Sequence, residues 1–139
     1  MAPVKPLVVL ALLAGLLPAP SNSNSNSNSS SNGALDEYLA ELAKTWGHDS
    51  FSPARGEALW YSDHDGRQCT SCHLDSLFAP GRHQKTGKVI EPMAPSVNPK
   101  RLTDRKKMKK WLLRNCKWTL GRECTALEKG DILVWLREQ

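Results

Sequence analysis

The sequence lacks a long hydrophobic run, and this absence limits the architectures open to it. Its longest apolar stretch, Leu7–Leu17, has 11 residues, about half of the roughly 20 that a membrane-spanning helix needs. No segment alternates apolar and polar residues as a half-buried strand does. The chain has 139 residues, too few for a two-domain enzyme, a large α/β sheet or a barrel once its terminal segment is set apart. We therefore expect one small α-helical domain.

Phenylalanine is also scarce, with two residues, although five tryptophans are many for a chain of this length. Hydrophobic residues at 40% and charged residues at 24% are typical of a globular protein. Few phenylalanines beside many tryptophans indicate that a large, flat apolar group shares the core.

The first part of the chain is typical of an export signal. Lys5 provides a positive charge, the apolar run follows it, and residues 19–21 form a small-x-small cleavage site. Prolines disfavour a buried helix here, and two outcomes stay open, a cleaved signal or a retained membrane anchor. We predict export to the periplasm, with a signal at 1–21, a flexible Ser/Asn-rich linker at 22–33 that cannot bury apolar surface, and the folded domain at 34–139.

Helices account for most of the domain. Ser52 followed by Pro53 is a favoured helix start, and Thr125 with Glu128 forms a capping box. Residues 74–100 contain six glycines and prolines without periodicity, which indicates a long loop around a ligand. We predict an all-α domain with helices over residues 35–46, from 53 to before the first cysteine, from 103 to about 120, and from 125 toward the C-terminus.

The most informative motif is Cys69-Thr70-Ser71-Cys72-His73. A C-x-x-C-H run in an exported protein is typical of one covalently attached haem c. The two thiols can add to the two vinyl groups of the haem, and the adjacent histidine is then the proximal iron ligand through Nε2. Its Nδ1 is expected to donate to a backbone carbonyl in the following loop. The haem is the flat group that the composition requires.

Two other uses of these cysteines compete with haem attachment. A thioredoxin-like redox pair needs a preceding strand and a βαβ pattern, and neither is predicted. A zinc site would add Cys116 and Cys124 to Cys69 and Cys72, but seven residues separate the second pair, more than the two to four of ordinary zinc motifs. Both alternatives have less support from the sequence than haem attachment.

Two residues compete for the other side of the iron. Met93 lies in a proline-rich loop like those of ordinary class I cytochromes c, yet only 20 positions after His73. Asn115 shares one helix face with Met108 and Trp111, where an amide needs a polar partner. A methionine ligand makes a pure electron carrier, whereas a weak ligand makes a protein that binds small molecules.

Two further features lie in the same region. Free thiols at Cys116 and Cys124 would be unusual in an oxidising compartment, so a disulfide between them is a candidate. Lys100–Lys117 contains nine lysines and arginines against one aspartate, a net charge of +8. This stretch is either a docking face for an acidic redox partner or a solvated helix face. We expect no nucleic-acid partner, because no binding motif accompanies the charge.

With these residues placed, the sequence from about Asp36 onward resembles the sphaeroides haem protein family of small bacterial monohaem cytochromes c. Its most specific segments are Arg82–Ser96 and Trp111–Leu136, the second of which contains Arg114-Asn115-Cys116. The resemblance implies a class I cytochrome c fold of about four helices and a long loop around one haem. It also implies that Asn115 is the distal ligand, that Cys116 and Cys124 form a disulfide, that Gly56 touches the C-terminal helix near Trp135, and that no methionine ligand is needed.

The resemblance implies a high-spin, ligand-binding cytochrome. An amide oxygen is a hard, neutral ligand that suits Fe(III) better than Fe(II), so reduction should release Asn115 and open the iron to O2 or NO. A dihaem cytochrome c or a membrane cytochrome b is the implied redox partner, and a monomer is expected. The alternative is a plain electron carrier with permanent His/Met ligation through Met93. No acid–base pair is evident beside the distal face, so the sequence names no catalytic residue.

Overall fold

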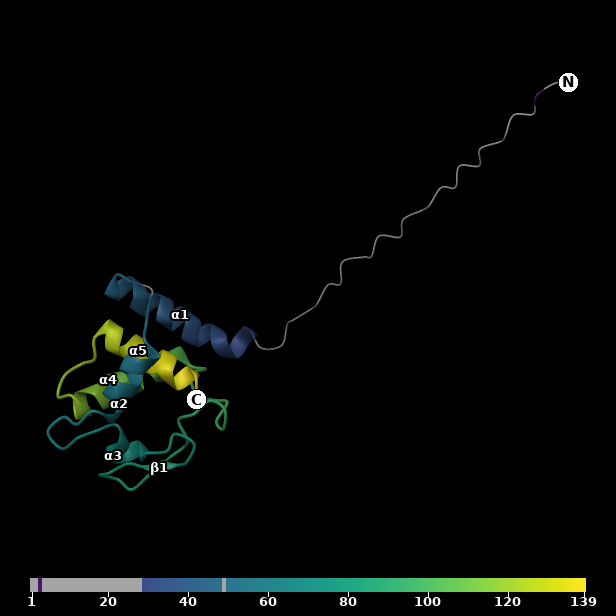
Figure 1. The fold of residues 1–139 in the computed structure, drawn as a ribbon. Coiled ribbons are helices and arrows are strands. Elements are labelled where there is room, and N and C mark those ends of the chain that lie inside the picture. Colours follow the sequence, from purple (N-terminus) through teal and green to yellow (C-terminus); the bar gives the residue numbers. More distant parts are fainter. Residues whose placement is uncertain (1–2, 4–28, 49) are drawn as a thin grey trace.

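The structure is a computed structural model that describes residues 3, 29–48 and 50–139. Nearly all of the predicted export signal and the first part of the predicted linker lie outside these residues. Within them, the first and longest helix lies on one side, and the shortest helix lies with a small hairpin on the other (Figure 1). In chain order the elements are α1 Ser29–Trp46, α2 Pro53–Tyr61, α3 Thr70–His73, β1 Gly81–Arg82, β2 Val89–Ile90, α4 Arg105–Thr119 and α5 Ala126–Arg137.

Helix α1 begins at Ser29, so the last five residues of the segment predicted as linker are helical. It ends before Gly47, whose φ of 82° is the left-handed conformation expected of a helix-terminating glycine. Leu35, Tyr38 and Leu42 are buried along one face. The sequence spacing predicted Leu35, Leu39, Leu42 and Trp46 for this face, but Leu39 is only partly buried and Trp46 is exposed. No helix of the described residues is both long enough and apolar enough to cross a membrane.

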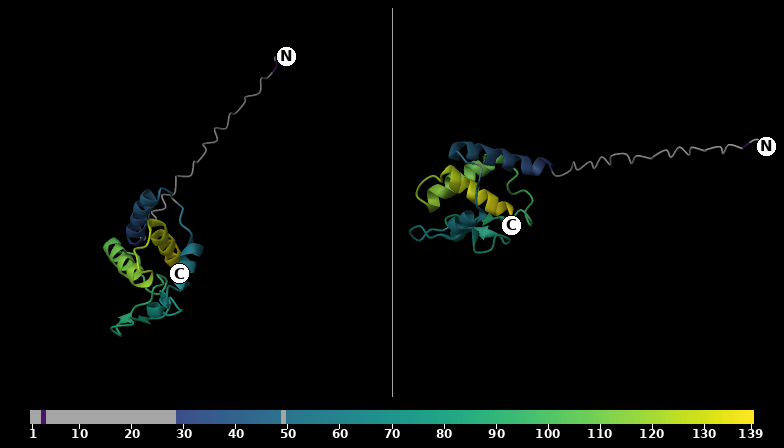
Figure 2. Two further views of the ribbon diagram at one scale, coloured as in Figure 1. Left: turned by 90° about the vertical axis from the view of Figure 1, so that its left-hand side faces the viewer. Right: turned by 45° about the horizontal axis from the view of Figure 1, so that its top comes forward.

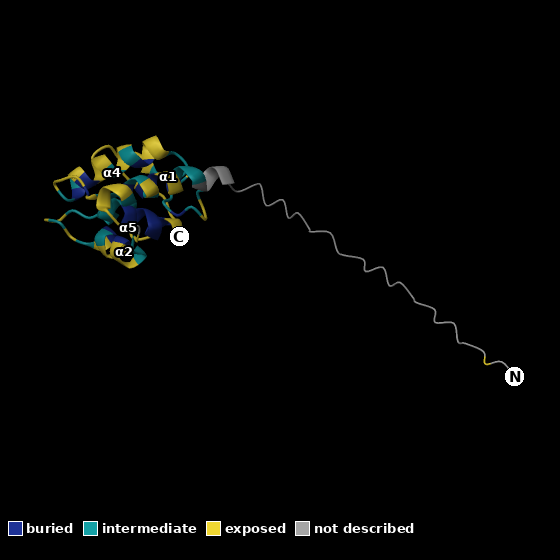
Figure 3. Ribbon diagram, turned by 90° about the horizontal axis from the view of Figure 1, so that it is seen from above, coloured by how far each residue is buried: buried dark blue, intermediate teal, exposed yellow. Residues whose placement is uncertain are grey.

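Helix α5 is the centre of the domain. Seven consecutive residues, Gly130–Leu136, are buried, so the helix is enclosed on all sides (Figure 3). It packs mainly on α2 and α1, and the further views show it between these helices (Figure 2). A side chain at Gly56 of α2 would collide with the backbone carbonyl of Asp131. The expected contact of Gly56 with the C-terminal helix is therefore present, one turn before Trp135.

A buried carboxylate joins α2 to α5. Asp131 is 3% exposed and accepts hydrogen bonds from the Ser52 backbone N–H at 2.6 Å and from Arg55 Nε and Nη2 at 2.7 and 2.9 Å. Ser52 is also the N-cap of α2, as predicted, because its side chain accepts from the Arg55 N–H. Cap and carboxylate together fix the start of α2 against α5.

The remaining helices confirm the all-α prediction with small corrections. The N-cap of α4 is Asp104 rather than the predicted Thr103, and the helix stops before Gly121, whose φ is 71°. The capping box of Thr125 and Glu128 at the start of α5 is confirmed. The structure also contains one helix that the sequence did not predict: α3, a single turn of four residues.

The expectation that the chain contains no strand was wrong for the long loop. Gly81 pairs with Ile90 and Arg82 with Val89 in a short antiparallel hairpin. Two residues per strand are too few to show an alternating pattern, so sequence periodicity had no means of finding them.

Two hydrophobic clusters lie on either side of α5. One joins α5 to α1 and α4, and the other joins α5 and α2 to the loop after α3. Leu102 and Leu112 are partly buried against both. The second cluster positions the C-x-x-C-H segment, and its buried members are Trp60, Leu77, Ala94, Ile132, Trp135 and Leu136.

Candidate functional site

One helical turn presents the C-x-x-C-H motif. Cys69 occupies the N-cap position of α3, and its carbonyl accepts the N–H of His73 at 3.1 Å. Residues three apart on a helix lie on the same side, so the turn brings the thiols of Cys69 and Cys72 to one side with the histidine next to them. Both thiols are free. The local fold therefore holds the predicted attachment residues together.

Strand β1 of the short hairpin packs against α3 and supports the backbone of the C-x-x-C-H motif. Leu74, which follows α3, has a φ of 61°, a left-handed conformation that is costly for a leucine. Gly81 of β1 packs against the backbone of Cys72 and His73, where a side chain would collide with the Cys72 carbonyl. A strained turn beside the motif is consistent with a functional constraint there.

His73 packs against one tryptophan of the core, with the two rings tilted relative to each other. Its ring centroid lies 5.0 Å from that of Trp60, and Trp60 lies 5.4 Å from Trp135. Burial, and to a smaller extent the positive charge of Arg101, lowers the pKa of His73 to about 4. The imidazole is therefore neutral at neutral pH, the form that binds a metal.

The second ring nitrogen of His73 does not make the predicted bond. Nδ1 is buried and has no hydrogen-bond partner among the described residues, and the same holds for Nε1 of Trp60 beside it. Unpaired polar atoms in a protein interior are unusual and often mark a functional site. A neutral imidazole next to two free thiols is a donor set that fits a covalently attached haem.

The state of Cys69 argues against a redox dithiol. Burial raises the pKa of this thiol to about 11, whereas catalytic cysteines have a lowered pKa. The side chain of Thr119, near the end of α4, lies close enough to this thiol to offset a small part of the rise in its pKa. This contact turns one face of α4 toward the C-x-x-C-H segment.

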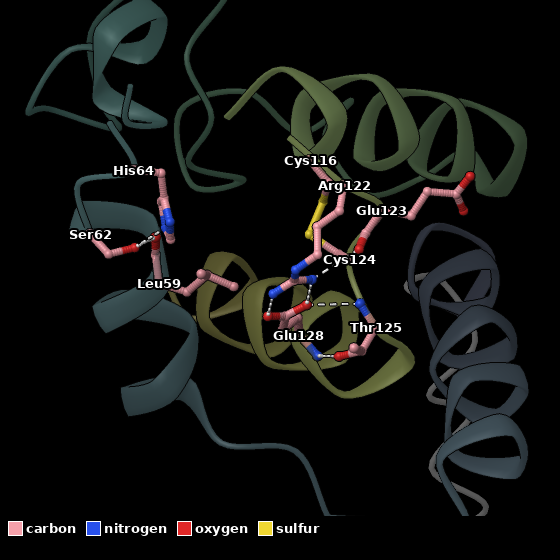
Figure 4. Close-up of a disulfide and its surroundings, with 9 residues drawn as sticks. All are labelled: Leu59, Ser62, His64, Cys116, Arg122, Glu123, Cys124, Thr125 and Glu128. Carbon is pink, nitrogen blue, oxygen red and sulfur yellow. Dashed lines mark hydrogen bonds and ion pairs between the residues drawn. A yellow bond between two sulfur atoms is a disulfide. The ribbon is translucent and has the colours of Figure 1, made fainter. Parts of the chain in front are cut away.

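Cys116 and Cys124 form the predicted disulfide, with their Cα atoms 5.5 Å apart. It ties the end of α4 to the chain just before α5 (Figure 4). The disulfide uses two of the four thiols that the zinc alternative required, and the described residues contain no cluster of three or more residues able to hold a metal ion. The four-cysteine zinc site is therefore excluded.

A charged cluster closes the same turn. Arg122 donates to both carboxylate oxygens of Glu128 at 2.7 and 2.8 Å, and Glu128 also accepts from the Thr125 N–H at 2.8 Å (Figure 4). The hydrogen bond from Arg122 is the main reason that the pKa of Glu128 falls to about 2. With the disulfide, this cluster fixes the connection between α4 and α5.

Asn115 lies on α4 directly before the disulfide. Met108, seven residues earlier, is 7% exposed and Thr119, four residues later, is 3% exposed. The three positions share one helix face, yet Asn115 itself is exposed and makes no hydrogen bond through its side chain among the described residues. Because Thr119 touches Cys69, the face that carries Asn115 is directed toward the motif.

Met93 packs on the side of His73. It is partly buried against the cluster that contains Trp60, the residue that stacks on His73. Its backbone N–H donates to the carbonyl of Leu77 at 2.9 Å, four residues after His73. The structure thus places Met93 next to the elements that support the histidine.

Three residues of this site were missed from the sequence. Trp60 was assigned only to a helix, and nothing marked Thr119 as a neighbour of Cys69. Arg101 was counted as part of a basic stretch, but it is half-buried and donates from Nε to the carbonyl of Pro92 at 2.8 Å. Burial lowers its pKa. Only the tertiary fold shows that this arginine fixes the proline-rich loop near His73.

Comparisons with known proteins agree with this arrangement. A family described as a domain of unknown function (DUF1924) matches residues 46–136. The cytochrome c-type protein SHP of Cereibacter sphaeroides is 44% identical over 90 residues, which cover 61% of this chain and 69% of that protein.

Solved structures give the same relationship. The structure of oxidized SHP, an oxygen-binding cytochrome c, superposes with a TM-score of 0.70 at 38% identity, covering 76% of this chain and 96% of that one. The solution structure of cytochrome c'' from Methylophilus methylotrophus, studied for its haem-ligand detachment, gives a TM-score of 0.61 at 25% identity, covering 78% and 93%. The chain therefore belongs to the sphaeroides haem protein family of c-type cytochromes, and its cofactor is covalently attached haem c.

Proposed function

We propose that this protein is an exported monohaem cytochrome c that accepts electrons from a redox partner and binds a diatomic ligand, O2 or NO. Ligand binding is controlled by Asn115, which leaves the iron on reduction. The oxygen binding of SHP and the haem-ligand detachment of cytochrome c'' support this proposal by analogy.

Four residues have defined roles in the proposal. Cys69 and Cys72 form the thioether bonds, His73 is the proximal ligand and Asn115 is the distal one. Bound haem supplies a one-electron centre with two axial positions. The neutral His73, held against Trp60, keeps one position occupied in both oxidation states.

The position of Asn115 carries the proposal. A polar, exposed residue lies between buried Met108 and Thr119, on the α4 face that reaches Cys69. Its amide oxygen is neutral and hard, so it binds Fe(III) better than Fe(II). Reduction therefore weakens this bond and lets a diatomic ligand take its place.

The alternative, permanent ligation by Met93, has less support. A distal methionine must lie across the haem from the proximal histidine, whereas Met93 packs with the Trp60 cluster against which His73 stacks. Its backbone is also bonded to Leu77, close to His73 in the chain.

The cellular setting is part of the same proposal. The signal predicted at residues 1–21 sends the domain to the periplasm, either free or tethered to the inner membrane. A dihaem cytochrome c or a membrane cytochrome b supplies the electrons, and the protein acts as a monomer.

The proposal is tested by changing the distal residue. In Asn115→Ala the haem should stay attached, and azide should bind the ferric protein about tenfold or more tightly, a change of about 1.4 kcal/mol, because no amide competes. Asn115→Met should give a ligand that stays bound in both oxidation states and should block CO and NO in the ferrous protein. Optical spectra of both oxidation states and azide titrations measure these effects.

Met93→Leu is the matched control, since it removes the other candidate ligand. Its spectra and its ligand affinities should equal those of the parent protein. If Met93→Leu instead opens the iron to azide while Asn115→Ala changes nothing, the protein is a His/Met electron carrier.

A further inference from the structure

The basic residues of α4 fall into three sets: those paired with α1, those paired with a nearby acidic residue, namely Lys107 with Asp104 and Lys117 with Glu123, and those with no acidic partner. Those that face α1 are neutralised: Arg105 lies 3.1 Å from Glu41 and 3.8 Å from Glu37, and Lys109 lies 2.6 Å from Glu41. These ion pairs join α1 to α4, so this set has a structural role.

The third set faces outward and has no acidic partner. Lys106, Lys110 and Arg114 follow one another at four-residue intervals and are exposed. Within the part of the chain that the structure describes, none of them forms an ion pair. We call these three residues the cationic stripe.

The cationic stripe opposes the stability of its own helix. Like charges four residues apart on a helix cost about 0.2–0.5 kcal/mol per pair. Lys106 also lies in the first turn of α4, which contains no acidic residue, where the helix dipole disfavours a positive charge. Other basic residues here do have acidic neighbours, such as Lys117, which lies 3.2 Å from Glu123. The stripe is therefore suited to an acidic group outside the domain.

An exposed aromatic ring lies within the stripe. Trp111 is 47% exposed, with Lys110 Nζ 5.3 Å and the Arg114 guanidinium carbon 5.7 Å from its ring centroid. Tryptophan and arginine are the residues most often responsible for affinity in protein interfaces. A flat ring flanked by cations offers both apolar area and charge to a protein surface.

The stripe is also placed for electron delivery. Arg114 precedes Asn115 in sequence but lies about 100° away around the helix, so the stripe occupies the outer side of the helix whose inner side carries the proposed distal ligand. A partner bound to the stripe is therefore separated from the haem site by the thickness of α4, about 10 Å. A membrane surface would match the charge equally well, but it would bring no electron donor to this helix. The placement therefore favours a redox protein.

We propose that the cationic stripe, with Trp111, docks an electron-donating protein that has an acidic surface around its redox centre. The inference rests on the proposed function and assigns the surface through which the protein receives its electron. One electron passes from the docked donor to the ferric haem, which leaves a ferrous haem and a donor oxidised by one electron.

The test compares reduction of the full-chain holoprotein by two donors. One donor is reduced flavodoxin, an acidic one-electron protein, and the other is a small neutral hydroquinone. In Lys106→Gln/Lys110→Gln the bimolecular rate with flavodoxin should fall about tenfold at low ionic strength, and the difference should vanish in high salt. The rate with the hydroquinone should not change.

Lys85→Gln/Lys88→Gln is the matched control. It removes the same charge from exposed lysines between the end of β1 and the start of β2, and it should change the flavodoxin rate by less than about twofold. Equal losses in both variants would mean that only net charge matters. A larger loss in the control would move the docking site to the C-x-x-C-H side, and no loss in either would leave the stripe a solvated face.

Two further outcomes separate the possible failures. If the parent protein binds vesicles rich in anionic lipid and the stripe variant does not, while flavodoxin rates are equal, the stripe binds a membrane and the inference is wrong. If docking behaves as expected but Asn115→Ala leaves azide binding unchanged, the docking surface stands and the distal-ligand proposal fails.

Discussion

The two proposed axial ligands, His73 and Asn115, are held in opposite ways. His73 is the last residue of the single-turn helix α3 and packs on Trp60, which in turn packs against the central helix. Asn115 is exposed on a helix whose outer face is crowded with uncompensated charge. A ligand that must stay bound is embedded in the core, and a ligand that must leave is placed where its release disturbs little packing.

The interactions that hold the elements around His73 and Asn115 in place differ as well. On the His73 side, α2 and α5 approach so closely that only glycine fits at position 56, and a buried carboxylate at Asp131 fixes their register. On the Asn115 side, the connection from α4 to α5 is held by a disulfide and a surface ion pair. Core packing fixes one side, and local cross-links fix the other.

The largest effect is expected from the attachment residues themselves. Replacing Cys69 and Cys72 by alanine should abolish covalent haem, because no thioether can form. Haem retention after acid–acetone extraction measures this. The variant with serine at Cys116 and Cys124 is the control and should retain its haem; covalent haem in the Cys69/Cys72 variant would refute the assignment.

A side chain at Gly56 should disrupt the packing of α2 on α5, which supports His73. Gly56→Ala forces a Cβ atom into the backbone of Asp131, and because backbone has little freedom to move we expect a loss of about 3 kcal/mol in unfolding free energy. Denaturant unfolding followed by circular dichroism measures it. Gly33→Ala in α1 meets no atom within 4 Å, so it should be neutral or slightly stabilising.

Loss of the disulfide should destabilise the connection between α4 and α5, next to Asn115. Replacing Cys116 and Cys124 by serine frees a short loop, and the chain-entropy model gives a loss of about 2.5 kcal/mol. The melting temperature should fall, while Trp60 and His73 keep their stacking. An unchanged melting temperature would mean that the ion pair alone fixes the connection.

The smallest effect on stability is expected from the ion pair between Arg122 and Glu128, and this effect should depend on pH. The pKa of Glu128 is lowered from 4.5 to about 2, so the stability that its carboxylate provides is present above 4.5 and is lost as the pH falls through about 2. Arg122 is 54% exposed, so solvent screening limits the contribution to about 1 kcal/mol. Glu128→Gln should be less stable than the parent at pH 7 by about this amount, and the difference should disappear between pH 4.5 and 2. A pH-independent difference would assign the effect to the lost cap on Thr125 instead.

Local sequence signals predicted much of the scaffold. Ser52 with Pro53, and Thr125 with Glu128, were correct helix starts because capping involves residues within one turn of each other. The start of α4 was displaced by one residue since Thr103 and Asp104 are both good caps. The hairpin and α3 were not found, because elements of two and four residues span only about one hydrophobic period and cannot repeat it.

Within the candidate site, the sequence identified the residues but not their neighbours. Cys69, Cys72 and His73 follow from a contiguous motif, and the structure confirms the disulfide of Cys116 with Cys124. The expected bond of His73 Nδ1 to a backbone carbonyl is absent among the described residues. The ligand role of Asn115 remains a prediction.

The sequence by itself determined the helical class, the haem c motif and the concentration of positive charge before and along α4, because each depends on residues that are close together in the chain. The tertiary structure decided that Trp60 supports His73, that Arg101 holds the proline-rich loop, that Thr119 turns α4 toward Cys69, and which cations of α4 are neutralised by α1. These contacts join residues that are far apart in the chain, and only the packing of the helices around α5 brings them together.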